Sequence, residues 1–264
     1  MVSRSDKIGT RTLRIQTAPE AAAQAIREAI ISGELRGGDR IIEQKWAAHL
    51  GIGQPTLREA LNELIHQGLL RKLQQRGTYV AQLSPTDYRL IQEIRIPLEA
   101  IAIGKAAENL TPEADAELEA LVAAMNGTTM SANEIKSFHD CDAAFHRKIW
   151  ELADNEYLRD TLEAISFKLF VFSVVDRWAD NPNAIRERVA AVQQHLAILE
   201  GLRSRYRHEA RRVFIKQTID YWNVQYGLGL REDEMSWASA SHERITGQTG
   251  SKLSALPTAV HSRR

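Results

Sequence analysis

The sequence predicts a mainly α protein of two domains: three helices and a β-hairpin at the N-terminus, followed by an all-α antiparallel helical bundle. Two short helical patterns are joined by a three-residue turn with two glycines, and a hairpin pattern with Gly77 in its turn follows them. From residue 84 to residue 230 only helical periodicity remains. A chain of 264 residues with 44% hydrophobic and 26% charged side chains has the composition of folded globular domains.

The N-terminal domain is expected to begin after a short arm. Residues 1–18 carry four basic side chains and almost no apolar pattern, so this arm is expected to be flexible. From 19 to 31, alanine and isoleucine recur at helical spacing, with a proline in the first turn and Gly33 just after the end. A second helix of about two turns is expected within residues 41–50, ending at Gly51.

A third helix is expected from residue 55 onward, with Gly68 just past its end, because one face of this segment is apolar. That face consists of Leu57, Ala60, Leu61, Leu64 and Ile65. Two short helices joined by a glycine-containing turn have the proportions of a helix-turn-helix, whose second helix lies in the major groove of DNA. The hairpin over 69–82 then forms a wing. Residues 19–83 are therefore predicted to be a winged helix-turn-helix, a DNA-binding domain.

Residues 84–230 are predicted to form a bundle of six helices. A capping-box pattern at residues 84–87, with proline at the first helical position, marks its start. Gly201 and Gly227 are expected to end the last two helices. The helices are expected near residues 85–109, 111–125, 131–153, 156–176, 182–200 and 206–226. Residues 231–264 lack sustained periodicity and are expected to be a disordered tail.

The distribution of charge gives weak support for a nucleic-acid partner. The net charge is zero, but residues 1–84 carry 12 basic and 8 acidic side chains, whereas the rest carries 22 basic and 26 acidic ones. The single cysteine, Cys141, excludes an internal disulfide, and the first residues lack the apolar core of a secretory signal. No apolar stretch approaches the roughly 20 residues that span a bilayer. We therefore expect a protein of the reducing cytoplasm with no membrane partner.

Residues 26–81 resemble the GntR-type winged helix-turn-helix, with LREAL and GLLRKLQQRG as the most specific parts. The helical half resembles the FadR-type (FCD) ligand-binding domain at residues 93–108, 142–158 and 194–199. The resemblance implies a transcriptional regulator that is not an enzyme. It further implies a cytoplasmic homodimer whose two heads bind a pseudo-palindromic operator in double-stranded DNA. A small-molecule effector, a carboxylate or related metabolite, would alter DNA affinity through the helical domain, which also mediates dimerisation.

Within this resemblance, Arg58 matches the DNA-contacting arginine of the recognition helix, and the wing tip approaches the minor groove. Gln44 and Gln54 stand where relatives commonly carry arginine. We therefore expect fewer phosphate contacts and a weaker salt dependence of DNA binding than in those relatives. From the residues alone, Arg58 could instead pair with Glu59 or Glu63 on a solvated face. The expected DNA-binding residues are Gln44, Gln54, Thr56, Arg58, Arg76 and Gly77.

Asp142 and His146 are four residues apart on one expected helix, so both side chains leave from the same face. With His195 on a later helix, they match the metal-binding aspartate and two of three histidines in many relatives. The resemblance thus implies a divalent ion such as zinc, nickel or manganese. At the position of the third histidine stands Gln217, a poorer ligand for zinc or nickel. The alternative is a hydrogen-bonded Asp–His pair in a polar cavity without metal.

Other side chains near this candidate metal site have two interpretations each. His139 lies on the same stripe as Asp142 and either supplies another ligand or is a surface histidine. Arg95 matches an arginine that faces the effector pocket in several relatives, where it would bind a carboxylate in bidentate fashion. An intrahelical pair with Glu99 is equally compatible with the sequence. The aromatic residues expected to pack the bundle, with one or two lining the pocket, are Trp150, Phe167, Phe170, Phe172 and Trp178.

Two other functions are compatible with parts of the sequence. An aspartate and two histidines around a metal with an open position can activate water, as in a metal-dependent hydrolase. No separate general base is identifiable, however, and a hydrolase would leave the winged domain unexplained. An architectural DNA-binding protein would use the helical half for dimerisation alone. Its DNA affinity would be the same in the presence of every metabolite.

Overall fold

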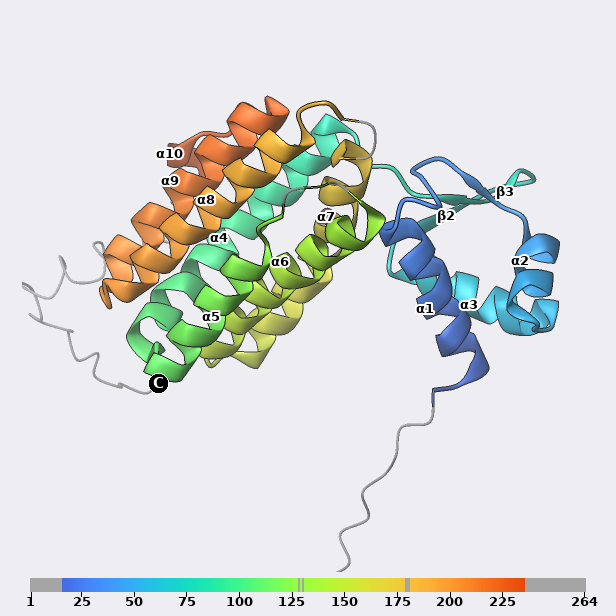
Figure 1. Ribbon diagram of the computed structural model, residues 1–264, viewed down its shortest axis with the longest axis horizontal. Coiled ribbons are helices and arrows are strands. Elements are labelled where there is room, and N and C mark those ends of the chain that lie inside the picture. The colour runs from blue at the N-terminus through green and yellow to red at the C-terminus, as the bar shows by residue number, and fades with distance from the viewer. Residues whose placement is uncertain (1–15, 128, 130, 179–180, 236–264) are drawn as a thin grey trace, which may run out of the picture.

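The computed structural model describes residues 16–235 except 128, 130, 179 and 180. Figure 1 shows two bodies side by side, a small head that carries the sheet and an elongated bundle of long helices. The predicted mainly α fold, a winged helix-turn-helix followed by a helical bundle, is confirmed. The expected arm up to residue 15, the expected tail from residue 236 onward and the side chain of Trp178 lie outside the described residues.

Three short helices form the head: α1 (Ala18–Ile31), α2 (Glu43–Leu50) and α3 (Gln54–His66). A capping box starts α1, because the Thr17 hydroxyl accepts from the Glu20 amide while the Glu20 carboxylate accepts from the Thr17 amide. Gly51 ends α2 with a φ of 65°, a left-handed conformation that favours glycine. The apolar faces of these helices enclose a core that includes Ile26, Ile30, Leu57, Leu61 and Leu64.

The wing is a three-stranded sheet, one strand larger than the expected hairpin. Its strands are β1 (Arg40–Ile41), β2 (Leu70–Leu73) and β3 (Gly77–Val80), arranged in the antiparallel order β1-β3-β2. The second helix was expected to begin at residue 41, but Ile41 is a strand residue opposite Thr78, and its side chain is buried. The additional strand pairs residues about 37 positions apart, which local periodicity does not reveal.

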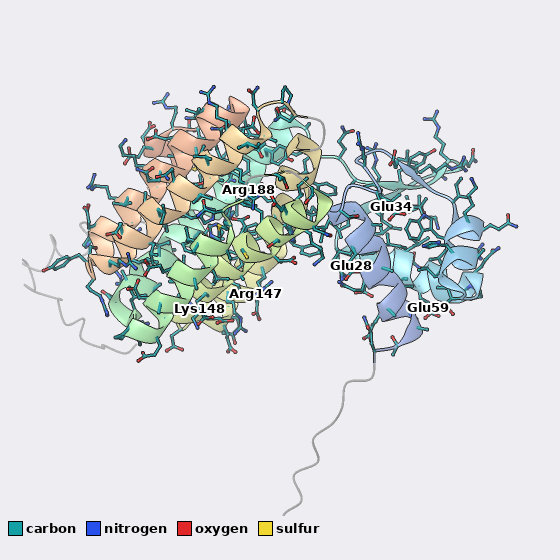
Figure 2. All side chains as sticks on the ribbon, in the orientation of Figure 1. Glu28, Glu34, Glu59, Arg147, Lys148 and Arg188 are labelled. Carbon is teal, nitrogen blue, oxygen red and sulfur yellow. The ribbon has the colours of Figure 1, made fainter. Side chains whose placement is uncertain are left out.

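Six long helices form the bundle, within about three residues of the expected bounds. They are α4 (Pro85–Asn109), α5 (Pro112–Ala124), α6 (Ala132–Leu152), α7 (Glu156–Trp178), α8 (Ala184–Arg203) and α9 (Arg207–Tyr226). Buried Arg188 on α8 ties the α5–α6 connection to the bundle, donating to the carbonyl oxygens of Met125 (2.7 Å) and Thr129 (3.2 Å) and to Glu134 (3.0 Å). The labelled Arg188 is seen within the bundle in Figure 2. Among the described residues, no helix has the length and apolarity required to cross a membrane.

Two features at the end of the bundle differ from what was expected. Gly201 does not end α8, which continues to Arg203. A Cβ at Gly201 would lie 3.2 Å from the side chain of Val213, so this glycine permits the close approach of α8 and α9. The segment expected to be a disordered tail from residue 231 begins with a four-residue helix, α10 (Glu232–Met235), and Met235 is buried in the bundle core.

Helix α7 belongs to both bodies. Leu162 and Leu169 lie in the bundle core, whereas Val171 and Phe172 are fully buried in the head core beside α1 and α3. Phe172 was expected to pack the bundle, and it packs the head instead. The head and the bundle are therefore joined by α7, which contributes to both apolar cores, as well as by the linker before α4.

Candidate functional site

The expected DNA-binding residues occupy the outer surface of the head. Gln44, Gln54, Arg58 and Arg76 are exposed, while Thr56 and Gly77 are half-buried. The N-cap of α3 is Gly53, which has no side chain to satisfy the first helical amides. These amides and the positive end of the helix dipole favour an anion such as a DNA phosphate. The start of α3 thus presents unsatisfied backbone amides beside exposed Gln54 and half-buried Thr56.

Arg58 pairs with neither of the expected glutamates of its own helix. Its Nε donates to Glu43 of α2 at 2.8 Å, and the Arg58 side chain is 61% exposed. An exposed ion pair of this kind contributes about 0–1 kcal/mol, so the guanidinium can exchange this carboxylate for a phosphate or a base at little cost.

The wing carries a basic residue that sequence reasoning missed. Arg40 of β1 is exposed, and its Nε lies 3.3 Å from where a Cβ on Gly77 would be. Gly77 has a φ of 104°, so both its backbone conformation and the guanidinium above it favour glycine here. The signal that identifies Arg40 is β1 itself, which brings this residue alongside the wing turn.

A buried polar cluster lies within the bundle and draws on several helices. Asp142 and His146 come from α6 and His195 from α8. Oδ1 of Asp142 lies 2.7 Å from Nε2 of His195 and 3.7 Å from Nε2 of His146. The ligand-capable atoms of the three residues lie within 4.8 Å of one another, and all three residues are buried. The structure therefore brings the expected trio together.

Glu99 of α4 supports this cluster, a role that sequence reasoning did not assign to it. Burial alone would raise the pKa of Glu99, but the neighbouring Arg95 and hydrogen bonds from His146 and Trp150 lower it to about 2. Nε of Arg95 lies 3.0 Å from Oε2 of Glu99, so Arg95 makes its intrahelical pair and also lines the pocket. Glu99 is therefore an ionised carboxylate that can only accept hydrogen bonds.

In each of the two imidazoles, the partner of Nδ1, the ring nitrogen that does not face Asp142, shows which nitrogen carries the proton. Nδ1 of His195 lies 2.7 Å from the carbonyl oxygen of Ala191, and because a carbonyl only accepts, this Nδ1 donates. Nδ1 of His146 lies 2.6 Å from ionised Glu99 and donates as well. Burial, the largest effect, lowers the pKa of His146, so its ring is neutral at pH 7. The lone pair of His146 Nε2 therefore faces the region of Asp142.

Gln217 and His139, the other two residues considered as metal ligands, do not join this cluster. Gln217 is half-buried but does not line the pocket, whereas the next residue, Thr218, does and accepts from Gln194 at 3.3 Å. His139 is buried, lies 3.1 Å from Asp140 and lines a different cavity, a cleft between the bundle and the head. The interpretation of His139 as a surface residue was therefore wrong.

The pocket that Asp142, His146 and His195 help to line is small, and polar groups without hydrogen-bond partners lie near it. Its volume is about 40 Å³, which holds about three water molecules. Nη2 of Arg95 is buried and has no hydrogen-bond partner among the described residues. One turn earlier on α4, both amide atoms of fully buried Gln92 are likewise unpartnered within the described part of the chain. Phe170 forms part of the wall, with its ring centroid 5.4 Å from that of His146.

The winged head and the bundle with its polar pocket together define a two-domain, DNA-binding transcriptional regulator. The chain belongs to the GntR family of bacterial regulators and carries a C-terminal domain of the FCD type. The family described as bacterial regulatory proteins, gntR family, matches residues 19–80, and the FCD domain matches residues 90–216. The expectation of a regulator instead of an enzyme is confirmed, because the relatives are transcriptional regulators.

Two curated relatives and one solved structure illustrate the similarity. The Nta operon transcriptional regulator of Aminobacter aminovorans is 30% identical over 180 residues, covering 68% of this chain and 80% of that protein. The HTH-type transcriptional repressor NanR of Cronobacter sakazakii is 25% identical over 225 residues, covering 78% of this chain and 84% of the repressor. The structure of E. coli McbR/YncC matches with a TM-score of 0.64 at 21% identity, covering 81% of this chain and 99% of that chain. This last match supports the fold alone.

Proposed function

We propose that the operator affinity of this regulator is controlled by a small carboxylate bound in the bundle pocket. Arg95 would bind the carboxylate, and a divalent metal ion held by Asp142, His146 and His195 would complete its binding. The pocket volume of about 40 Å³ favours an acid of only a few non-hydrogen atoms. In this proposal the protein binds DNA as a homodimer, with one head on each half of a pseudo-palindromic operator.

The observation that carries this proposal is the contact between His195 and Asp142. Nε2 of His195 lies 2.7 Å from Oδ1 of Asp142, yet the carboxylate lies outside the direction in which an Nε2 proton would point. A lone pair facing an ionised carboxylate at this distance is repulsive unless a proton or a metal ion is shared between them, and the proposal assigns a metal ion to this place. The pKa of Asp142 supports the ionised form: burial, the largest single effect, would raise it, but His195, His146 and Arg95 together lower it below its ordinary value.

The donor set fits a first-row divalent ion. Two imidazole nitrogens and one carboxylate suit zinc, nickel and manganese, and they leave coordination positions open. The hydrogen bonds of His146 to Glu99 and of His195 to Ala191 orient the rings in the way that ligand histidines usually require. A bound ion would supply a Lewis acid for the effector carboxylate. Arg95, with its unpartnered Nη2, supplies the complementary charge from the chain itself.

Helix α7 offers a route from this pocket to the head. Phe170 lines the pocket, and the Arg95 guanidinium lies 5.1 Å from its ring centroid. The next two residues, Val171 and Phe172, are buried in the head core. A shift of Phe170 on effector binding would therefore move part of the head core. Typical coupling of this kind corresponds to about 1–3 kcal/mol, or a 5- to 150-fold change in operator affinity.

Dimerisation has candidate contact surfaces on two helices of the bundle. Leu90 and Ile94 of α4 are 54% and 56% exposed, and Ile185 and Val189 of α8 are 48% and 52% exposed. Each pair is four residues apart, so each forms an apolar strip on one helix face. Large aliphatic side chains at helical spacing on a surface favour burial against a second subunit.

Metal analysis and calorimetric titration with zinc, nickel and manganese test the metal part of the proposal. We expect nearly one ion per chain in the wild type, loss of binding in His146→Ala and unchanged binding in His208→Ala, which removes an exposed histidine from α9. Absence of both bound metal and titration heat in the wild type would reject the metal and leave Arg95 as the effector anchor.

Operator binding measured by fluorescence anisotropy tests the effector part. Short mono- and dicarboxylates should change the operator affinity of the wild type at least fivefold and leave that of Arg95→Met unchanged. Constant affinity in the presence of every acid would favour an architectural DNA-binding protein over a ligand-controlled regulator.

A further inference from the structure

A second and larger cavity lies between the head and the bundle. Its volume is about 650 Å³, which is within the range of about 300–1,000 Å³ typical of ligand sites. Arg27 of α1 and residues 66–67 at the C-terminal end of α3 line it from the head. Segments 139–150 of α6 and 160–170 of α7 line it from the bundle. In Figure 2, the labelled Glu28 marks the side of the head nearest the bundle, and Arg147 marks the bundle helix α6.

The bundle side of this interdomain cleft is largely apolar. Phe167 is half-buried and packs against the head core, while Phe170 and Trp150 are buried with edges that reach the cleft. Ala143 and Ala164 leave space beside them, because their side chains are a single methyl group. This surface suits the flat or aliphatic body of a small organic molecule.

The polar groups of the cleft leave an excess of positive charge. The two acidic residues are already paired, Glu163 with Arg147 at 2.8 Å and Asp160 with Arg159 at 2.8 Å. Lys168 is half-buried in the cleft, where its side chain packs against Gly68 of the head and its charge acts on the Asp87 carboxylate. The lining carries three basic side chains (Arg27, Arg147 and Lys168) and two acidic ones, so an anion entering the cleft would meet a net positive charge.

Arg27 adds a second donor on the opposite wall. Its terminal nitrogens donate to Gln24 and, at 3.0 Å, to Gln67, and Nη2 lies 3.9 Å from the Glu63 carboxylate, but its Nε is buried without a hydrogen-bond partner among the described residues. The guanidinium also lies 5.9 Å from the ring centroid of Phe167, a cation–π contact that joins α1 to α7. Apolar walls and donors therefore meet where the two domains touch.

We propose that the interdomain cleft is a second ligand site, for an organic anion with an aromatic or apolar body. The acid group would bind Lys168 and Arg27, and the body would lie against Phe167. Because the walls belong to both domains, the bound anion would hold the head in one orientation to the bundle. This site is separate from the bundle pocket at Asp142, His146 and His195 and does not depend on it, although Phe170 lines both cavities.

The fluorescent anion 8-anilinonaphthalene-1-sulfonate is a suitable probe, because it combines an aromatic body with a negative charge. Titration of the full-length protein should show one saturable site per chain. Lys168→Met should weaken binding at least tenfold, and Ala164→Trp, which places an indole in the cleft at an exposed position, should abolish it. Lys216→Met, at an exposed lysine of α9, is the matched control and should bind like the wild type.

Two further measurements distinguish binding at this site from binding in the bundle pocket and from nonspecific binding to apolar surface. Binding should persist in His146→Ala, since the metal cluster lies outside the cleft, so failure of the metal proposal would leave this one intact. The uncharged analogue N-phenyl-1-naphthylamine should bind at least tenfold more weakly. Equal binding of both probes, or unchanged binding of the anion in Lys168→Met and Ala164→Trp, would overturn the proposed site.

Discussion

Replacing Phe172 with alanine should loosen the head while leaving the bundle folded. The ring lies in the head core although its helix belongs mainly to the bundle, and it is 0% exposed. Truncation would leave a cavity beneath α1 and α3. Only side chains of the head core pack directly against this cavity. The two bodies have separate apolar cores, so the damage is expected to be local.

The expected size of the effect follows from the burial of the ring. Removing a fully buried phenylalanine side chain costs about 3–5 kcal/mol through lost transfer free energy and cavity formation. Because each 1.36 kcal/mol corresponds to a factor of ten, opening of the head should become about a hundredfold to several thousandfold more frequent. Leu162→Ala is the matched control, since Leu162 is also 0% exposed on α7 but lies in the bundle core.

Amide hydrogen exchange followed by mass spectrometry can measure both bodies in one sample. In Phe172→Ala, peptides from α1 and α3 should exchange much faster, and peptides from α9 should exchange as in the wild type. Leu162→Ala should give the opposite pattern. Equal acceleration in α1 and α9 of the Phe172 variant would refute the reasoning, because it would show that the head and bundle open as one unit.

Three further predictions concern other parts of the molecule. Arg58→Ala should weaken operator binding at least tenfold and make the logarithmic salt slope shallower by about 1 per chain, and an unchanged slope in anisotropy titrations would argue against a phosphate contact. The double variant Leu90→Glu and Ile94→Glu should halve the mass seen by light scattering, whereas a mass that stays dimeric would place the interface elsewhere. Arg188→Ala should lower the free energy of unfolding in urea by about 3 kcal/mol, because it removes the partner of the buried Met125 carbonyl group and of Glu134, while exposed Arg186→Ala should change it little.

Local signals in the sequence were sufficient to place most of the helices. Thr111 and Ser84 each cap a helix with the hydroxyl accepting from a backbone amide three residues on, and a proline follows each of them. These devices act within one turn, so the order of the residues alone reveals them. The pairing of Asp142 with His146 on one face of α6 was predictable for the same reason.

Features that depend on distant residues were not predictable in this way. β1 is two residues long and exists because Arg40 and Ile41 meet β3, which no local pattern records. Glu99 looked like an ordinary helical ion-pair partner, and its role became visible only when α6 brought His146 and Trp150 against it. Gly201 was mistaken for a helix stop because its contact with the neighbouring helix lies outside its own sequence window.

The placement of Val171 and Phe172 in the head core limits how far the two halves of this protein can be exchanged with those of its relatives. A chimera cut in the linker near residue 83 would combine one head with an α7 whose side chains were fitted to another. The side chains that α7 places in the closely packed head core would then not match the volumes of the head residues around them. Engineered sensors built from this chain should therefore transfer residues 171–172 together with the head, treating the DNA-reading module as two segments of sequence.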